Sequence, residues 1–263
     1  MNKYALSTDR ATAIHCLSSD VFAHLMTLKM LTLFPQACVT TTYREGDSWS
    51  CLTLLDISAS GWDSQKYPNQ ESVVFLDGNN EQFLKIAFEN APKKNVIFKV
   101  HDSFSRSQVA QLPGIEQTYS FLSYSTSAIP KKSLQSVSRV QVCAELTAEA
   151  IDGFEQNAYT QEELQYHFQN GARWLRLDVG GACVSQCLVF QNFNLVWEIG
   201  GVFTPPALRR KGYAKKVVNA AIRYLRLRNR LPRYQFEAAN QGSRALAESV
   251  GLNHVLTVDH FKI

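Results

Sequence analysis

The sequence predicts a mixed α/β protein made of two halves. Short strand-like runs alternate with segments of helical periodicity along the whole chain. A serine-rich stretch with two prolines near the middle separates an earlier series of such elements from a later one. The run from Trp197 to Asn240 has the pattern strand, loop, helix and strand, which is a βαβ unit. We therefore expect an N-terminal α/β domain at residues 1–135 and a second domain at 136–263.

In the first half, residues 11–34 predict one or two helices that end before Pro35. Ser19 or Asp20 is expected to cap a second helix that begins near Val21 and places its leucines on one face. The strand-like and helical segments that follow are strands at 37–43, 50–57, 72–76 and 95–100, and a short helix at 81–90. Asp77-Gly78-Asn79 resembles part of a calcium loop, but the later acidic ligands are missing, so we interpret it as a turn.

Residues 102–137 are rich in serine and contain Pro113, Gly114 and Pro130. We place the linker between the halves at about 128–137. No strand or helix is predicted between 102 and 128.

The second half begins with a strand at 137–142 and a helical region at 147–167. Within that region Thr160 and Glu163 have the spacing of a capping box. Gly180-Gly181 is typical of a two-residue hairpin turn between strands. The remaining elements are strands at 172–179 and 182–191, a central strand before the βαβ loop, a helix at 243–250 and a final strand at 255–263.

The composition is that of a soluble globular protein. Of the 263 residues, 45% are hydrophobic and 19% are charged. The formal net charge of +4 offers no bulk electrostatic argument for nucleic acid. No run of about 18 apolar residues and no apolar signal core occurs in the sequence. We expect a cytoplasmic protein without membrane or nucleic-acid partners, and its oligomeric state stays open.

Neither the cysteines nor the early histidines predict a metal site. The six cysteines contain no CxxC pair, and we expect all of them to be reduced thiols. His15 and His24 lie in the N-terminal helical segment, where no second type of metal ligand is spaced to join them. We therefore interpret them as ordinary helix histidines and expect no metal cofactor.

The loop at the centre of the βαβ unit, Arg209-Arg210-Lys211-Gly212-Tyr213-Ala214, has the properties of an anion site. It follows a Thr-Pro-Pro turn and opens a helix, where unpaired backbone N–H groups and the helix dipole favour negative charge. Gly212 allows a ligand to approach the backbone closely. Between Arg209 and Arg233 the chain has ten Lys or Arg and no acid. Neither of the nucleotide patterns G-x-x-x-x-G-K-[ST] and G-x-G-x-x-G is present.

This Arg-x-x-Gly-x-Ala loop resembles the acyl-CoA loop of the GNAT superfamily. The preceding strand end at 202–205 and the downstream Asn240-x-x-Ser243, Leu246-Ala247-Glu248 and Gly251-Leu252 strengthen the resemblance, which covers roughly 139–263. It implies a mixed, largely antiparallel sheet flanked by helices in the C-terminal half. The overall layout is similar to the glycine N-acyltransferase-like branch and to bacterial proteins with two GNAT-like halves.

The resemblance also implies binding residues for acetyl-CoA or another acyl-CoA. The backbone of Val202, Phe203 and Thr204 would pair with the pantetheine arm beyond a bulge at Gly200-Gly201. The pyrophosphate would be held by the loop residues Arg209, Arg210, Lys211, Gly212, Tyr213 and Ala214. Asn240 and Ser243 would line the far wall, and Asn240 is equally suited to cap the last helix. Many GNAT enzymes carry a tyrosine where this chain has Ala247.

The expected activity is transfer of an acyl group to a primary amine of a small molecule or peptide by direct attack. No Ser-His or Cys-His arrangement is placed to form a covalent intermediate. Glu198 is the only acid between Asp178 and Glu237, and we assign it the role of general base. The alternative for Glu198 is a solvent-facing or ion-paired glutamate at the end of a strand, and Glu248, Asp259 and His260 are the other candidate bases.

Two other functions remain open at this point. The chain could be a non-catalytic CoA-binding or sensing module that retains the GNAT loop, which the alanine at 247 favours. The basic helix could instead bind an anionic surface or nucleic acid, which would require a steep salt dependence.

Overall fold

The computed structural model describes residues 4–128, 139–157 and 159–263. The chain forms two compact units, Met1–Phe121 with Leu256–Ile263 (unit 1) and Leu122–Val255 (unit 2). Apart from Ala128, the predicted linker at about 128–137 lies outside the described residues, as does the start of the strand predicted at 137–142. Within the described segments, no helix has the length and apolar character needed to cross a membrane.

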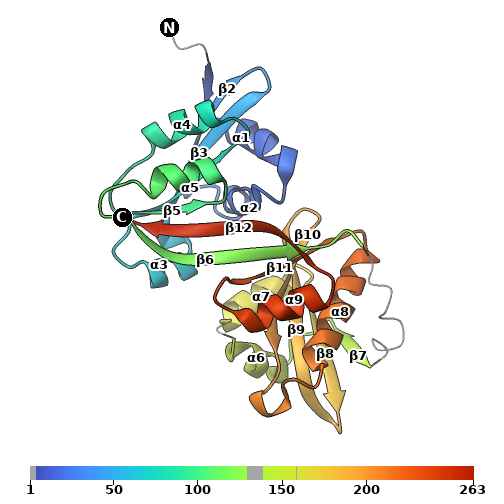
Figure 1. Ribbon diagram of the computed structural model, residues 1–263. Coiled ribbons are helices and arrows are strands. Elements are labelled where there is room, and N and C mark those ends of the chain that lie inside the picture. Colours follow the sequence, from blue (N-terminus) through green and yellow to red (C-terminus); the bar gives the residue numbers. More distant parts are fainter. Residues whose placement is uncertain (1–3, 129–138, 158) are drawn as a thin grey trace. The chain divides into compact units, whose positions relative to one another are not determined.

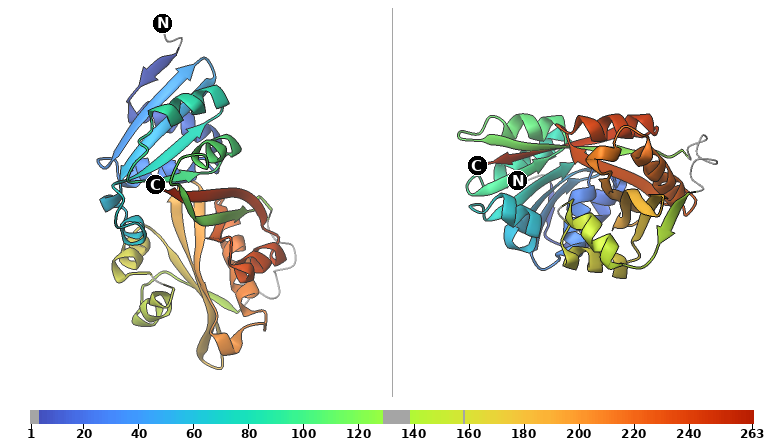
Figure 2. Two further views of the ribbon diagram at one scale, coloured as in Figure 1. Left: turned by 60° about the vertical axis from the view of Figure 1, so that its left-hand side comes forward. Right: turned by 90° about the horizontal axis from the view of Figure 1, so that it is seen from below.

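Unit 1 is a twisted sheet with helices on both faces (Figures 1 and 2). Its strands follow the order β1-β2-β3-β4-β5-β12-β6, in which β4 and β5 are parallel neighbours. The strands are β1 (Ala5–Ser7), β2 (Cys38–Glu45), β3 (Ser48–Asp56), β4 (Ser72–Gly78) and β5 (Val96–Val100), with parts of β6 (Glu116–Ser125) and β12 (Asn253–Lys262). The helices are α1 (Arg10–Leu17), α2 (Leu25–Leu33), α3 (Gly61–Lys66), α4 (Glu81–Asn90) and α5 (Ser103–Val109), with short 3-10 turns η1 (Ser18–Asp20) and η2 (Ile57–Ala59).

The alternation of side chains along β4 divides the core of unit 1 into two layers. Val74 and Leu76 pack with α4 and α5, whereas Val73 and Phe75 pack toward α2. A sheet covered on both faces requires apolar residues at consecutive positions, which explains the unbroken apolar run of β4. Asp77, two residues beyond Phe75, belongs to the α2 side by the same alternation.

Most predicted elements of unit 1 are present, with two corrections. The predicted helix at 81–90 is α4, capped by Asn80. The second helix begins at Leu25 and not near Val21, because Asp20 accepts N–H groups from Phe22 and Ala23 and holds a turn there. The serine-rich segment after residue 102, for which no element was predicted, contains α5 and β6.

Unit 2 is a mixed, largely antiparallel sheet, as the resemblance implied. Its strand order is β6-β11-β10-β9-β8-β7, and the β10–β11 pair is parallel. The remaining strands are β7 (Val140–Cys143), β8 (Arg173–Val179), β9 (Ala182–Phe193), β10 (Val196–Phe203) and β11 (Leu231–Glu237). The helices are α6 (Ala148–Glu155), α7 (Gln161–Gln169), α8 (Tyr213–Arg226) and α9 (Gln241–Ser249), with the 3-10 turn η4 (Pro206–Leu208).

Two local predictions in unit 2 are confirmed. Gly180 and Gly181 have φ values of +61° and +83° and join Val179 to Ala182 across the β8–β9 hairpin. The helical region at 147–167 is two helices, α6 and α7, and the second begins with the Thr160–Glu163 capping box.

Helices cover both faces of the unit 2 sheet (Figure 2). On one face, α8 buries its apolar side against β8, β9 and β10 through residues that include Val217, Val218, Ala221, Ile222 and Leu225. On the other face, Phe154 of α6 and Leu164 of α7 pack on Trp174, Leu188 and Phe190. The basic side of α8 is left on the surface, which is typical of an amphipathic helix.

A buried ion pair joins α3 to β5 in unit 1. Lys99 Nζ lies 2.7 Å from Asp63 Oδ1 and 2.8 Å from Oδ2. Only 6% of Lys99 and 2% of Asp63 is exposed. Burial lowers the pKa of Lys99, and the charge of Asp63 opposes that shift.

We expect Lys99→Met to destabilise the protein by about 3–5 kcal/mol, because it leaves the Asp63 carboxylate buried without a cation. Urea unfolding measures the loss. Lys85→Met is the matched control, since Lys85 and Glu89 form an exposed pair that contributes about 0–1 kcal/mol. The double variant Asp63→Leu/Lys99→Met should recover much of the lost stability. Equal urea midpoints for Lys99→Met and the parent protein would contradict the assignment.

Candidate functional site

The parallel strands β10 and β11 separate after three residue pairs. Val196, Trp197 and Glu198 of β10 pair with residues 231–233 of β11, and in the described structure the pairing ends there. On its other side, β10 shifts register against β9 between Gly200 and Phe203. Such a bulge leaves backbone groups without their usual ladder partners. The bulge expected at the glycines is therefore present, and the β10 backbone beyond Glu198 is released from β11.

Glu198 lies at the point where the two strands separate. Its Oε2 accepts hydrogen bonds from Arg233 Nη1 at 2.7 Å and from Asn192 Nδ2 at 3.0 Å. Its Oε1 accepts the backbone N–H of Gln235 at 3.0 Å. The side chain is buried and ties together β9, β10 and β11. The ion pair held open as the alternative for Glu198 thus exists, while its action as a base stays a prediction.

The segment between α6 and α7 lies against the glycine bulge. Asn157 Nδ2 donates to the carbonyl oxygen of Gly201 at 3.3 Å, and the Gly201 backbone also hydrogen-bonds the Tyr159 hydroxyl. A Cβ at Gly200 would lie 2.4 Å from the Tyr159 oxygen, and one at Gly201 would lie 2.8 Å from the Phe154 ring. Gly201 also has a φ of +58°. Both positions therefore require glycine.

Tyr159 keeps its proton at neutral pH. Burial raises the pKa of Tyr159, and the nearby negative charge of Glu198 raises it further. Its phenol is therefore available as a hydrogen-bond donor beside the bulge. Asn157 and Tyr159 were not predicted from the sequence, because neither belongs to a motif and only the fold brings them to β10.

The basic loop follows β10 and is shaped by left-handed backbone. Arg210 has a φ of +62° and Gly212 a φ of +77°. Arg209 Nε donates to the carbonyl oxygen of Thr204 at 3.0 Å, which draws the loop back onto the end of the strand. A non-glycine residue with positive φ is uncommon and is a reason to suspect a functional constraint.

Gly212 is the N-cap of α8 and is exposed. No side chain bonds the N–H groups there, and a Cβ at Gly212 would meet nothing within 4 Å. Arg209, Arg210 and Lys211 are exposed as well. The start of α8 therefore offers free donors and positive charge in open space.

The two residues predicted for the far wall lie at the start of α9. Asn240 Oδ1 accepts the N–H of Ser243 at 2.9 Å, so its expected capping role is confirmed. The Tyr234 hydroxyl donates to Ser243 Oγ at 3.1 Å. Contact of either residue with CoA stays a prediction. Ala247 is fully buried among the residues that pack against α8, so a tyrosine would not fit at this position without repacking.

The reserve bases have other partners. Glu248 accepts a hydrogen bond from the Tyr124 hydroxyl at 3.3 Å. Asp259 forms an ion pair with Arg106 and accepts from Gln117 at 3.1 Å. His260 is buried in unit 1, and burial lowers its pKa to about 2. A neutral imidazole with so low a pKa is a poor base at neutral pH.

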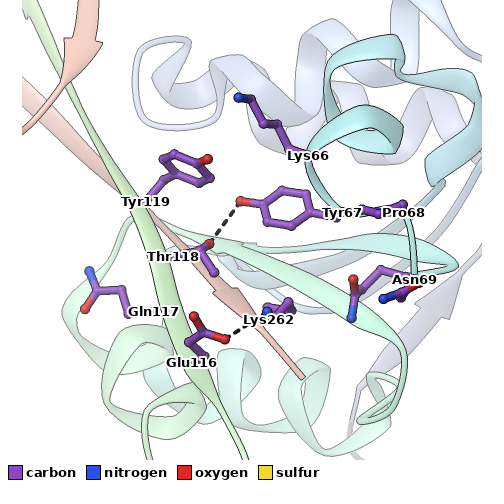
Figure 3. A pocket seen from close by; sticks show the side chains of 10 residues that line it. Lys66, Tyr67, Pro68, Asn69, Glu116, Gln117, Thr118, Tyr119 and Lys262 are labelled. Atoms are coloured by element: carbon purple, nitrogen blue, oxygen red, sulfur yellow. Dashed lines mark hydrogen bonds and ion pairs between the residues drawn. The ribbon is translucent and has the colours of Figure 1, made fainter.

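Unit 1 has a separate polar pocket of about 420 Å³ (Figure 3). Tyr67 and Thr118 share a hydrogen bond of 3.0 Å on its wall, and Lys262 pairs with Glu116 at 2.8 Å. These bonds pair four of the polar side chains that line the pocket. We assign no function to this pocket.

All six cysteines are free thiols, as expected.

Comparison with known protein families agrees with the geometry of unit 2. No curated protein matches the chain by sequence. Residues 140–252 match the family model described as "Acetyltransferase (GNAT) family". This range contains the basic loop, α8 and the point after Glu198 where β10 and β11 separate, which we call the fork.

Solved structures resemble nearly the whole chain. A GCN5-related N-acetyltransferase from Sphaerobacter thermophilus is 12% identical, covers 100% of this chain and 96% of its own, and gives a TM-score of 0.60. A Drosophila protein is 14% identical, and the match covers 100% of this chain and 99% of the Drosophila chain with a TM-score of 0.59. A GNAT-family acetyltransferase from Colwellia psychrerythraea is 11% identical, and the match covers 98% of this chain and 99% of the Colwellia chain with a TM-score of 0.56. At these identities the likeness concerns the fold alone. Together with the family match, it identifies the C-terminal half of the chain as a domain of the GNAT acetyltransferase superfamily.

Proposed function

We propose that the protein transfers an acyl group, most simply acetyl, from acyl-CoA to a primary amine within a ternary complex. The observation that carries this proposal is the fork between β10 and β11, where the released end of β10 leads through the basic loop to the uncapped start of α8. A fork releases backbone groups that an extended ligand arm can pair with. The start of α8 attracts phosphate groups. Acyl-CoA has both parts, an amide-containing arm and a pyrophosphate.

In this proposal each predicted binding residue has a distinct role. The backbone of Val202, Phe203 and Thr204 pairs with the pantetheine amides, where β10 lacks β11 as a partner. The loop from Arg209 to Ala214 binds the pyrophosphate through N–H groups and cations. Asn240 and Ser243 line the opposite wall. Acyl-CoA is a co-substrate, and the proposed chemistry uses no metal.

The proposed reaction is a direct attack of the amine on the thioester carbon. A new C–N bond forms, the C–S bond breaks, and the thiolate of CoA leaves. A backbone N–H at Phe203 or Thr204 polarises the thioester carbonyl. Glu198 accepts a proton from the incoming ammonium, directly or through water. The attacking nitrogen loses its second proton as the amide forms. Since Ala247 provides no phenol on α9, this proton reaches the thiolate through water or through the Tyr159 hydroxyl.

A non-catalytic CoA-binding or sensing module is the second candidate. Two observations favour it: Ala247 lies in the core, and all three hydrogen bonds of Glu198 are to protein donors. Release of free thiol from acetyl-CoA, measured with a panel of amines, separates the two candidates. Turnover with any amine supports the transferase, and tight binding of CoA without turnover supports the module. No binding of either acetyl-CoA or CoA would exclude both.

We expect Arg209→Ala and Arg210→Ala each to weaken acetyl-CoA binding by about 1–3 kcal/mol, the range of a charge-assisted hydrogen bond. Isothermal titration measures the change. The loss should be smaller for a short pantetheine thioester, which lacks the pyrophosphate. Arg228→Ala is the control, because Arg228 lies beyond the far end of α8 and stacks on Tyr224. Equal losses for the two ligands would contradict pyrophosphate binding by this loop.

A further inference from the structure

Three side chains capable of binding a metal meet in unit 1, outside the proposed acyl-transfer site. His24 is the residue that precedes α2, Asp77 lies near the end of β4, and His101 directly follows β5. Because β4 and β5 are parallel neighbours, their carboxyl ends lie at the same edge of the sheet. The carboxyl edge of parallel strands is a common position for ligands in α/β sheets.

The donor atoms are close enough to share one ion. His24 Nδ1 lies 2.8 Å and His101 Nδ1 lies 3.9 Å from Asp77 Oδ1. One ligand atom from each of the three residues lies within 4.8 Å of the others. Ligands at about 2.0–2.2 Å from a tetrahedral zinc ion are about 3.4 Å apart. The observed separations lie on both sides of this value, so small rotations of the two rings would complete the geometry.

The surrounding residues hold this arrangement in place. Asp77 Oδ2 accepts the Thr27 hydroxyl at 2.6 Å, which directs Oδ1 toward the two imidazoles. The Trp49 ring packs edge-on against His24 with centroids 5.3 Å apart, and the His24 and His101 rings are also 5.3 Å apart. Hydrogen bonds to a ligating carboxylate and packing on a ligating imidazole are typical supports of metal sites.

Charge and donor chemistry favour a cation here. Only 2% of Asp77 is exposed, and its partners His24 and Thr27 are buried too. A buried carboxylate requires hydrogen bonds and, ideally, a compensating charge. Two imidazole nitrogens and one carboxylate oxygen are a donor set suited to Zn²⁺, with a fourth position left for water.

We propose that His24, Asp77 and His101 bind a zinc ion that joins the start of α2 to the carboxyl ends of β4 and β5. This site would stabilise unit 1 and is independent of acyl transfer. No metal was expected from the sequence, because His24 had no ligand of a second type at suitable spacing; the fold brings Asp77 and His101 to it. The competing arrangement is a metal-free network in which Asp77 is satisfied by hydrogen bonds alone.

The test uses the full chain after treatment with a chelator and removal of that chelator. Zinc is titrated in competition with a chromophoric chelator, and the melting temperature is measured with and without one equivalent of ZnCl₂. We expect one zinc ion per chain and a rise in melting temperature, since a ligand bound only by the native state stabilises it.

Four variants distinguish the proposed zinc ligands from a supporting residue and from a histidine outside the site. His101→Gln and Asp77→Asn should weaken zinc binding by more than ~100-fold, beyond the ~10–100-fold typical of outer partners, and Thr27→Val should fall within that range. His15→Gln replaces an exposed histidine of α1 and should bind zinc like the parent protein. His101→Gln retains the His24–Asp77 bond, so its fold in the absence of zinc, checked by circular dichroism, should match the parent.

Two results would overturn the proposal. One is the absence of stoichiometric zinc binding to the parent protein. The other is zinc binding of equal affinity in His101→Gln and His15→Gln, which would place the ion elsewhere, for example on the six thiols that every variant retains.

Discussion

Replacing Gly212 with valine should abolish the rise in melting temperature that acetyl-CoA produces in the parent protein. Gly212 has a φ of +77°, in the left-handed region where a β-branched residue is strained by about 1–3 kcal/mol. The valine side chain would also extend into open space at the N-cap of α8. A phosphate that binds the first N–H groups of this helix would meet the side chain there. Differential scanning fluorimetry at about 100 times the parent Kd should show a stabilisation of about 2.7 kcal/mol in the parent and none in the variant.

Gly181→Val is the matched control for this experiment. Gly181 also has a positive φ, +83°, and a Cβ there also meets nothing within 4 Å. It lies in the β8–β9 turn, away from the basic loop in the chain. We expect this variant to lose a similar amount of intrinsic stability and to keep the full acetyl-CoA shift. A full shift in Gly212→Val would remove the loop from the binding site.

Several elements of unit 2 could be predicted from the sequence because the residue patterns that specify them are local. The Gly180-Gly181 turn, the Thr160 capping box and the periodicity of α8 each depend on residues within a few positions of one another. Local patterns of this kind can be interpreted without knowing the fold. The serine-rich segment shows the opposite case. In β6 the serines alternate with aromatic and aliphatic residues such as Tyr119 and Phe121, and this strand was not predicted from the serine-rich composition.

Buried polar partnerships could not be predicted, because they join residues that are distant in sequence. Glu198 was recognised as an isolated acid, but its partner Arg233 was counted only as one of ten cations in the run that begins at Arg209. Arg233 is in fact only 4% exposed. The same limitation applies to Lys99 with Asp63, whose pairing depends on α3 packing over β5. Burial decides whether a charge must have a partner, and burial is a property of the tertiary structure.

This ion pair bears directly on the proposed base. Glu198 has to act as a carboxylate while Arg233, Asn192 and the Gln235 N–H already occupy its oxygens. A carboxylate has about four lone-pair positions, so one acceptor position remains for a water or an ammonium. Removing the charge of Glu198 therefore has two separable consequences. The site loses its proton acceptor, and the buried guanidinium of Arg233 loses its anion.

Glu198→Gln should lower turnover by about 10²–10⁴-fold while acetyl-CoA affinity persists, because glutamine keeps the shape of the side chain and cannot accept the proton. An amine acceptor arrives as ammonium at neutral pH, since its pKa is about 10. The loss should therefore be largest near pH 7 and should diminish as pH rises and free amine becomes available. Turnover is measured as thiol release across this pH range, and binding by titration.

The control is Arg233→Gln, which breaks the same ion pair but retains the carboxylate. Both variants should be less stable than the parent, Glu198→Gln by about 3–5 kcal/mol because it leaves the guanidinium buried without an anion. Only Glu198→Gln should show the pH-dependent loss of turnover. Equal losses in the two variants, independent of pH, would mean that the ion pair holds the fork of β10 and β11 in shape and that Glu198 is not the base. Parent-like turnover of Glu198→Gln at pH 7 would lead to the same conclusion, and water would then be left to take the proton from the amine.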